Sequence, residues 1–314
     1  EIINKTVKNI PQTILKLLDY GKSKLKKAQI KYACEEAQLL LGYVLNLEKY
    51  QLFLDGKKKI SPDNVQKYYL WIEQRMKGIP IQHITGFQNF MGLEFITRKG
   101  VFIPRPETEI LVEKVIEIIN NVAGKRTFRL LDIGVGSGVI PITICHYFRQ
   151  SQKNIIFYAI DTSPKAIDLA RENARRFQCT ENIKFFQGDL FAPLNILNDN
   201  GDFDGIISNP PYITSHRLAY LSDEVRLYEP KTALDGGKEG LDVCTQLVTK
   251  AYQYLNKNGF LGLEIGYNQK NKILKLIRGS QCSFNSIECY QDYLHNDRII
   301  IACKSEDLLK GKVY

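Results

Sequence analysis

The sequence predicts an α/β protein in which a small helical domain precedes a mostly parallel seven-stranded sheet that ends in an antiparallel hairpin. Two observations predict this class. The first part of the chain carries apolar residues at helical spacing, whereas beyond Lys125 short apolar runs alternate with amphipathic helices. At 314 residues the chain is long enough for two domains of ordinary size.

Residues 1–78 are predicted to form the helical domain. Apolar side chains recur there at intervals of three and four residues, which is the spacing of one helix face. Ser61 followed by Pro62 is a typical helix start, and Gly78 with Pro80 is a typical stop. The expected helices cover residues 13–28, 33–45 and 62–77.

Residues 79–105 are predicted to connect this domain to the sheet. The helical spacing gives way to short β-like stretches at 90–96 and 100–103, separated by turn residues, which indicates a hairpin. A helix over 106–121 then opens the remaining domain, residues 106–314.

The sheet domain repeats a pattern of strand and helix. Its strands are expected to be buried on both faces, because runs such as 155–160 and 203–207 are apolar throughout. The last two strands are too close in sequence for a parallel crossover and are expected to form an antiparallel hairpin. The expected strands are 128–133, 155–160, 183–186, 203–208, 260–265, 284–289 and 299–303. The expected helices are 139–147, 164–177, 241–255 and 268–277.

Composition excludes several classes of protein. No window approaches the roughly 20 apolar residues of a membrane span, and the start of the chain lacks a secretory signal, so a cytoplasmic or organelle-matrix protein without membrane contact is expected. The seven cysteines are scattered and lack metal-ligand spacing, which favours reduced thiols and no metal site. The four histidines are dispersed, and neither His146 nor His295 is placed as a general base.

The net charge of +9 is concentrated near the start of the chain. Residues 1–80 hold 15 Lys and Arg against 8 Asp and Glu, a difference of +7. A solvated helical surface would explain this charge, and so would a surface for an acidic partner or a nucleic-acid-bearing assembly. Composition leaves both explanations open.

A glycine-rich loop, Leu-Asp-Ile-Gly-Val-Gly-Ser-Gly at 131–138, follows the first strand of the sheet. The carboxyl ends of such strands bind nucleotides, and glycines allow the backbone to approach a ligand closely. The spacing differs from the Gly-x-Gly-x-x-Gly of pyrophosphate loops, and Asp132 would repel an anion. The loop therefore favours a cation such as S-adenosylmethionine, with its sulfonium and ammonium groups. The expected contacts come from Asp132, Gly134, Val135, Gly136, Ser137 and Gly138.

Acidic residues follow the next two strands as well. Asp161 ends the second strand, where a carboxylate can accept both hydrogen bonds of a ribose diol, although it could instead act only as a helix N-cap. After the third strand, Asp189 can accept from an adenine amine and Leu190 can pack on the base. The three loops in series indicate an S-adenosylmethionine site more specifically than any one of them does.

The fourth strand leads into Asn209, Pro210, Pro211 and Tyr212 at the same edge of the sheet. The two prolines make the loop rigid and remove amide donors, so at least one carbonyl is free to accept from a ligand. The Asn209 carboxamide adds a second acceptor and Tyr212 an aromatic face. Two acceptors beside a ring suit a planar NH₂ group, which predicts methyl transfer to an amide or amine nitrogen.

These motifs together resemble class I (Rossmann-like) methyltransferases that modify nitrogen. Enzymes with the same tetrapeptide act on DNA adenine, ribosomal RNA guanine or a protein glutamine. The stretches Ile-Pro-Ile-Gln-His-Ile-Thr-Gly at 79–86 and Phe-Ile-Pro-Arg-Pro-Glu-Thr-Glu at 102–109 look like the connector of the HemK (PrmC) family. So do Tyr-Glu-Pro at 228–230 and Leu-Asp-Gly-Gly-Lys-Glu-Gly-Leu at 234–241.

The HemK resemblance implies methylation of the glutamine side-chain nitrogen N5 in the Gly-Gly-Gln motif of class I peptide chain release factors, which modulates translation termination. It implies S-adenosylmethionine as cofactor, S-adenosylhomocysteine as product, no metal, and no direct nucleic-acid partner. Asn209, Pro210, Pro211 and Tyr212 would bind and orient the glutamine amide, with Asn209 also near the cofactor. The helical domain would recognise the release factor, and Arg105 would help to shape a cleft. An N-methyltransferase acting on an exocyclic amine of DNA or ribosomal RNA remains the alternative.

Overall fold

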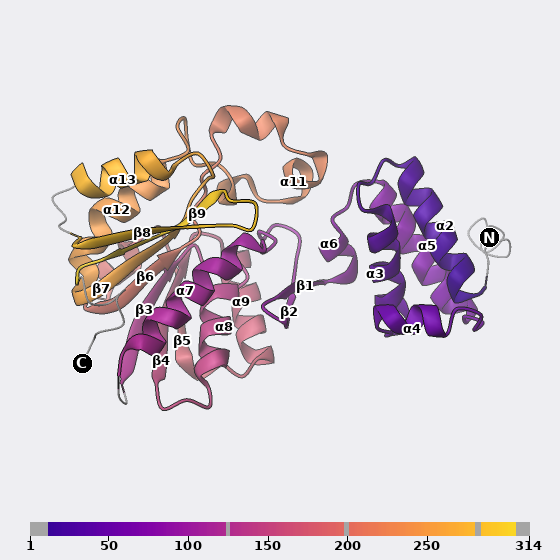
Figure 1. Ribbon diagram of the computed structural model, residues 1–314, viewed down its shortest axis with the longest axis horizontal. Coiled ribbons are helices and arrows are strands. Elements are labelled where there is room, and N and C mark those ends of the chain that lie inside the picture. Colours follow the sequence, from indigo (N-terminus) through magenta and orange to yellow (C-terminus); the bar gives the residue numbers. More distant parts are fainter. Residues whose placement is uncertain (1–11, 124–125, 198–200, 280–283, 306–314) are drawn as a thin grey trace. The chain divides into compact units, whose positions relative to one another are not determined.

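The computed structural model describes residues 12–123, 126–197, 201–279 and 284–305 (Figure 1). Internal contacts divide the described chain into two compact units. The helical unit contains the residues up to Phe87 together with Asp223–Tyr228. The sheet unit contains Gln88–Ser222 and the residues from Glu229 onward. No helix in the described ranges is both long and apolar enough to cross a membrane.

The helical unit contains the three helices predicted from spacing. Its core is built from apolar faces that meet around Leu17, Leu40 and Tyr68, all fully buried. Ser61 caps α5 by accepting from the Asn64 amide, as the sequence indicated. Three short helices of this unit, α4, α6 and α11 (Asp223–Tyr228), were not predicted, because five or six residues give too little periodicity to detect. The helices before the hairpin are α2 Ile14–Lys27, α3 Ala33–Leu45, α4 Lys49–Leu54, α5 Pro62–Met76 and α6 Ile81–Thr85.

The connector contains a hairpin, but not the predicted one, because its turn falls inside the stretch 90–96 that was expected to be a single β segment. Strand β1 (Phe87–Phe90) pairs with β2 (Leu93–Ile96) across a turn in which Met91 and Gly92 both have positive φ. The strand expected at 100–103 is wrong. Gly100 turns in the left-handed region, and the Ile103 amide donates to the Glu229 side chain instead of a neighbouring strand. The apolar residues there are buried by packing and not by a sheet.

The sheet has the order β5-β4-β3-β6-β7-β9-β8 (Figure 1). Strands β3 to β7 are parallel, and β9 pairs antiparallel with both β7 and β8, so the predicted closing hairpin is confirmed. The strands are β3 Thr127–Ile133, β4 Asn154–Asp161, β5 Ile183–Gln187, β6 Phe203–Ser208, β7 Leu255–Glu264, β8 Ser286–Gln291 and β9 Asp297–Cys303.

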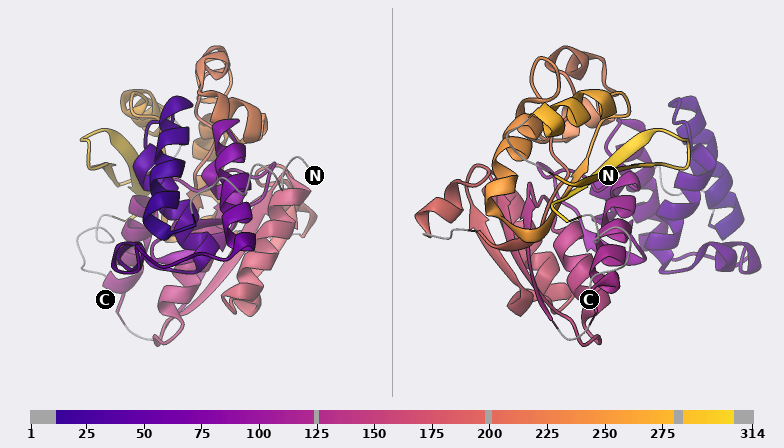
Figure 2. Two further views of the ribbon diagram at one scale, coloured as in Figure 1. Left: turned by 90° about the vertical axis from the view of Figure 1, so that its right-hand side faces the viewer. Right: turned by 60° about the vertical axis from the view of Figure 1, so that its left-hand side comes forward.

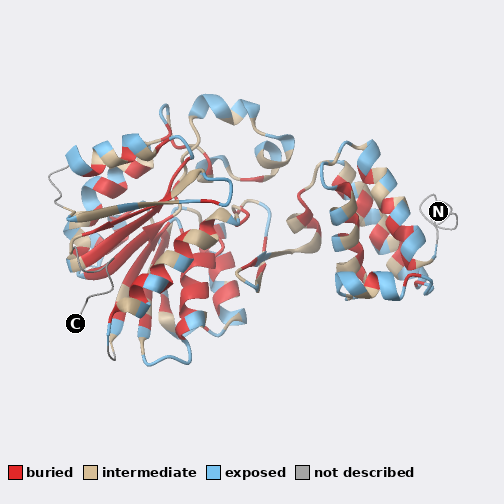
Figure 3. Ribbon diagram, in the orientation of Figure 1, coloured by how far each residue is buried: buried red, intermediate tan, exposed pale blue. Residues whose placement is uncertain are grey.

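Helices cover both faces of this sheet, which explains its continuous apolar strands (Figures 1 and 2). One core lies under α7, α8 and α9, and the other under α10, α12 and α13. Figure 3 shows the strands buried between the two layers. The helices of the sheet unit are α7 Glu107–Asn121, α8 Val139–Phe148, α9 Pro164–Arg176, α10 Ala192–Ile196, α12 Asp242–Tyr254 and α13 Lys270–Gly279, with short 3₁₀ turns at Thr180–Asn182, Ser215–Tyr220 and Lys231–Ala233, whereas α11 (Asp223–Tyr228) belongs to the helical unit.

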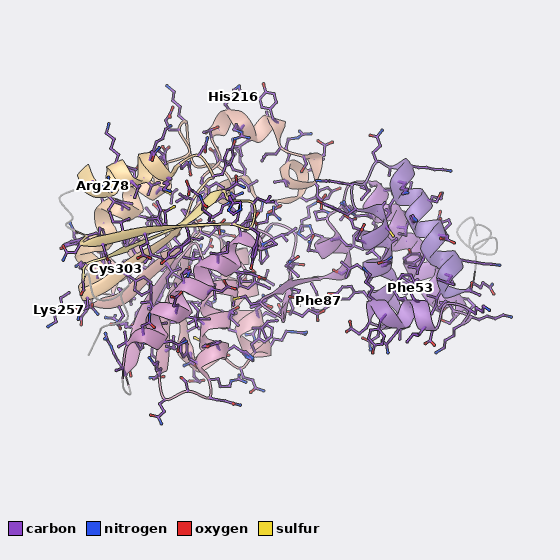
Figure 4. The ribbon with its side chains drawn as sticks, in the orientation of Figure 1. Phe53, Phe87, His216, Lys257, Arg278 and Cys303 are labelled. Atoms are coloured by element: carbon purple, nitrogen blue, oxygen red, sulfur yellow. The ribbon has the colours of Figure 1, made fainter. Side chains whose placement is uncertain are left out.

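The described cysteines are free thiols that serve mainly as small packing residues. Cys303, at the end of β9 and labelled in Figure 4, is fully buried. Cys145, Cys179 and Cys244 are also buried, while Cys34 and Cys289 are partly exposed. Cys282 lies outside the described residues.

Candidate active site

The predicted site residues gather at the carboxyl edge of the sheet, where the chain order reverses between β3 and β6. Such a switch point is where open α/β sheets bind ligands. The loops after β3 and β6 are tied together there, because Ser208 Oγ donates to the Ile133 carbonyl at 2.6 Å. A Cβ atom built on Gly134 would lie 3.9 Å from the Asn209 carbonyl oxygen. The glycine loop and the Asn209 tetrapeptide are therefore neighbours.

The glycine loop has the backbone that its composition predicted. Gly134, Gly136 and Gly138 all have positive φ, and Gly138 is the N-cap of α8. At Gly138 the positive φ disfavours any side chain, and a Cβ would also crowd the end of the Ile142 side chain at 2.7 Å and Ala170 Cβ at 3.2 Å. The Val135 amide is taken by the Ile160 carbonyl at 3.1 Å, and the Ser137 side chain is buried.

Asp132 places a carboxyl group without a described partner at the end of β3. The side chain is fully buried, and neither oxygen has a hydrogen-bond partner in the part of the chain that the structure describes. Burial, reinforced by the nearby charge of Asp161, raises the pKa of this carboxyl well above its ordinary value. A buried acid without a partner is destabilising unless a ligand supplies the positive charge or the donors that it lacks.

Asp161 organises the same edge from β4. One of its oxygens accepts from the Gly136 amide and the other from the Ser163 amide, each at 2.9 Å. Burial raises the pKa of Asp161, and these backbone hydrogen bonds oppose the shift. Ser163 is the N-cap of α9, so the alternative in which Asp161 serves only as that cap is wrong.

The loop after β5 lies beside this edge, because the Gly188 amide donates to the Asp161 carbonyl at 3.0 Å. Asp189 is exposed. Leu190 has a left-handed backbone and packs into the core under α10 and α12, with 8% of its surface exposed. Its contact with an adenine base stays a prediction.

The tetrapeptide after β6 offers two oxygen acceptors. No described residue donates a hydrogen bond to Asn209 Oδ1 or to the Pro210 carbonyl, whereas Asn209 Nδ2 donates to Thr108 Oγ1 at 3.0 Å. Pro210 is buried, and Pro211 is partly exposed. The Tyr212 hydroxyl donates to Glu264 at 3.1 Å, so this ring is anchored at its polar end.

Sequence reasoning missed Glu264 and Thr108. Glu264 is a fully buried carboxylate at the end of β7, and it accepts from Thr108 Oγ1 at 2.6 Å as well as from Tyr212. The only signal was an acid within the run 260–265, two residues before Gly266. Thr108 lies in the Pro-Glu-Thr-Glu stretch that was read as connector.

A second layer holds the tetrapeptide backbone. Gln269 is buried and donates to the Tyr212 carbonyl at 3.0 Å and to the Gly240 carbonyl at 2.9 Å, while its own oxygen accepts from the Gly266 amide. Ile213 pairs with the 234–236 stretch through two backbone hydrogen bonds. The Leu-Asp-Gly-Gly segment at 234–237 therefore supports the loop 209–212 that follows β6.

Arg105 has a structural partner in the sheet unit. It forms an ion pair with Glu229, whose side chain is almost fully buried, and its guanidinium lies 4.9 Å from the centre of the Phe102 ring. The pair fixes the connector against the Tyr-Glu-Pro segment at 228–230. A role for Arg105 in shaping a substrate cleft stays a prediction.

Comparison with known proteins gives the family. Residues 16–86 match the PrmC N-terminal domain, and residues 92–224 match the methyltransferase small domain. A protein of Clostridium botulinum named release factor glutamine methyltransferase is 37% identical, over 92% of this chain and 98% of the relative. A protein of the same name from Geobacter sulfurreducens is 36% identical over 92% of this chain and 95% of the relative.

A solved structure described as a release factor-specific protein-(glutamine-N5) methyltransferase, from Alicyclobacillus acidocaldarius, is 19% identical and covers 64% of this chain and 93% of its own. Its TM-score is 0.38, and an overlay this loose adds nothing to the assignment. The sequence relatives decide it: the chain belongs to the release factor glutamine methyltransferase family.

Proposed function

We propose that this protein transfers the methyl group of S-adenosylmethionine to the side-chain nitrogen N5 of the glutamine in the Gly-Gly-Gln loop of class I release factors, leaving S-adenosylhomocysteine. The observation that carries the proposal is the match, over nine-tenths of the chain, to relatives named release factor glutamine methyltransferase. The acceptor geometry around Asn209 supports it from the chemical side.

The cofactor would supply an electrophilic methyl group bound to a sulfonium, and the chain has suitable groups to hold it. The partnerless carboxylate of Asp132 fits the cationic amino-acid end of the cofactor. In the proposed arrangement Gly134, Val135, Gly136, Ser137 and Gly138 line its path. Asp161 accepts from the ribose hydroxyls, Asp189 from the adenine amine, and Leu190 packs on the base.

The acceptor is a poor nucleophile, because the lone pair of an amide nitrogen is delocalised into its carbonyl. Asn209 Oδ1 and the Pro210 carbonyl oxygen can each accept one proton of the NH₂ group, which fixes its plane and aims its nitrogen at the methyl group. Pro211 keeps the loop rigid, and the Tyr212 ring packs against the amide. As the nitrogen gains positive charge, both hydrogen bonds strengthen, so they stabilise the transition state more than the bound substrate.

No strong base is required at this nitrogen, because its remaining protons become acidic once the methyl group is attached. This proton passes to solvent water, because the two carbonyl oxygens that accept its hydrogen bond are too weakly basic to keep it. Burial raises the pKa of the Tyr212 hydroxyl, and its contact with Glu264 raises it further, so this group serves to hold the ring in place and not to remove a proton.

The test is to incubate the protein with labelled S-adenosylmethionine and one candidate acceptor at a time. Purified release factor should take up label, and its variant with Ala in place of the Gly-Gly-Gln glutamine should not. DNA and ribosomal RNA are the other arms. Label in a nucleic acid, or equal label in the release factor lacking that glutamine, would contradict the proposal.

The same assay reports on the helical unit, which this proposal assigns to release-factor recognition because of its basic charge. Lys57, Lys58 and Lys59 are exposed there. Replacing all three by Glu should raise the KM for release factor and leave cofactor affinity unchanged, since charge complementarity mainly affects encounter with the partner. An unchanged KM would remove this assignment.

A further inference from the structure

Glu264 does not belong to the tetrapeptide, yet it anchors two of its side chains. Its two oxygens accept from Thr108 and from Tyr212, and Thr108 in turn accepts from Asn209. Helix α7, strand β7 and the loop after β6 thus meet at one buried carboxylate. This chain of hydrogen bonds ends on the carboxamide that is proposed to bind the acceptor.

The carboxylate decides the direction of each hydrogen bond in the chain. An ionised carboxylate can only accept, so the single hydroxyl proton of Thr108 must be donated to Glu264. Toward Asn209, Thr108 then offers only a lone pair. The carboxamide must turn its NH₂ group to Thr108. Its oxygen then points away from Thr108 and is available to accept a hydrogen bond from the NH₂ group of the methyl acceptor. An inverted carboxamide would set NH₂ against NH₂.

We propose that Glu264 is a positioning residue for methyl transfer, which through Thr108 fixes the carboxamide oxygen of Asn209 toward the acceptor amide and through the tyrosine hydroxyl holds the Tyr212 ring. This inference rests on the proposed function, because an acceptor NH₂ is what requires an oxygen partner. It explains why a charged side chain occupies a fully buried position at the end of an apolar strand.

The charge state of Glu264 is set by the groups around it. Burial raises its pKa to about 7; the hydrogen bonds from Thr108 and Tyr212 oppose that shift, Glu107 adds to it, and Arg298 opposes it. Arg298 is itself paired with Asp292 at 2.9 Å. When Glu264 is protonated it can donate to Thr108, and the Thr108 proton is freed to turn toward the Asn209 oxygen. The productive orientation is therefore lost as the pH falls through about 7.

Variants of Glu264 and Thr108 test this chain of hydrogen bonds. Glu264→Gln keeps the size of the side chain but can donate, and Thr108→Val removes the hydroxyl, so each should lower kcat by on the order of 10- to 100-fold. Thr108→Ser retains the hydroxyl and should keep most of the rate. Both residues act on the orientation of the Asn209 carboxamide. The double variant Glu264→Gln/Thr108→Val should therefore be no slower than the slower of its two single variants. Cofactor Kd should stay within about twofold of wild type.

The pH profile separates positioning from a merely structural role. At saturating cofactor, the wild-type kcat should rise between pH 6 and pH 8, on either side of the Glu264 pKa of about 7, and that step should be missing in Glu264→Gln. Glu113→Gln, which removes an exposed carboxylate from α7, is the matched control and should behave as wild type. A Glu264→Gln enzyme with wild-type kcat and pH profile, or multiplicative losses in the double variant, would overturn the inference.

Failure of this inference is distinguishable from failure of the proposed function. Methylation of release factor by the wild-type protein tests the function alone. The ratios of variant kcat to wild-type kcat are measured on whichever NH₂-bearing substrate the wild-type protein methylates. They therefore still test the role of Glu264 if that substrate is not the release factor. Thermal melting of each variant shows whether a lower kcat reflects a loss of folding. At position 108, the comparison of Thr108→Ser with Thr108→Val separates loss of the hydroxyl from a change in packing.

Discussion

Each unit of the molecule buries an ionisable side chain that invites comparison, Arg75 in the helical unit and Asp132 in the sheet unit, and their surroundings differ. In the helical unit, Arg75 is 4% exposed and fully paired, with Glu36 bound through two nitrogens and Glu224 at 2.9 Å. In the sheet unit, Asp132 is 0% exposed and has no partner among the described residues. Both charges come from a chain whose other ionisable groups are mostly at the surface.

We interpret the difference as one between a structural charge and a buried acid that is available to a ligand. A buried guanidinium with two carboxylates contributes to folding, and here it fastens the Asp223–Tyr228 segment to helices α3 and α5. A buried carboxylate without a partner destabilises the fold, and such groups persist mainly where a ligand uses them. Glu264 lies between these cases, because it is satisfied by donors but not by a cation.

The largest effect is expected when the paired charge is removed. Arg75→Met should destabilise the protein by about 4 kcal/mol, because Glu36 would keep a partly buried carboxylate without its cation. Cofactor affinity should not change, since Asp132 and the glycine loop belong to the sheet unit. Chemical denaturation and calorimetric titration measure the two quantities.

A matched control is Arg98→Met, which breaks an exposed ion pair with Glu172 and should change stability by less than about 0.5 kcal/mol. If Arg75→Met were as mild as this control, Arg75 would not be a structural charge and the comparison would fail.

Glu264 should give a pH-dependent difference in stability. Its pKa in the folded protein is about 7 against an ordinary value of 4.5, so the folded state holds the proton more tightly than the unfolded state. The resulting stabilisation is complete below 4.5 and is lost as the pH rises through 7. Relative to Glu264→Gln, wild type should therefore lose about 3 kcal/mol of unfolding free energy between pH 4.5 and pH 8. A difference that is constant with pH would show that Glu264 does not titrate in this range.

The sequence was sufficient for much of the fold because the relevant signals are local. Helix spacing located α2, α3 and α5, and continuous apolar runs located the strands of the sheet. The short separation of the last two strands was enough to make them antiparallel. The strand expected at 100–103 is wrong because the consecutive apolar residues 101–103 look the same in sequence whether a sheet or a packed loop buries them.

The site was predictable only where residues adjoin a strand end. Asp132, Asp161 and Asn209 each follow an apolar run, and parallel strands bring their ends to one edge. Thr108 and Glu264 are 156 positions apart, and their hydrogen bond depends on how α7 packs on β7, which no local pattern encodes. The pairing of Arg75 with Glu224 was invisible for the same reason.

The smallest expected effect on stability, but the clearest on function, comes from the unpaired charge. Asp132→Asn should weaken cofactor binding by on the order of 100-fold, about 2.7 kcal/mol, because the amide cannot neutralise a cationic ligand. The fold itself should be unchanged or slightly more stable, which is the opposite of Arg75→Met. Calorimetric titration with S-adenosylmethionine and thermal melting give the two numbers.

Proton linkage sharpens this last prediction. Burial raises the pKa of Asp132 in the free protein, whereas a bound cation favours its ionised form, so cofactor binding should release a proton. Affinity should then increase with pH over the range in which the free carboxyl titrates, and the binding heat should depend on the ionisation enthalpy of the buffer. Asp132→Asn removes the titrating group and should abolish both effects. If wild type bound the cofactor without proton release and Asp132→Asn bound it equally well, Asp132 would be a buried structural acid, and the contrast with Arg75 would reduce to a difference in hydrogen bonding.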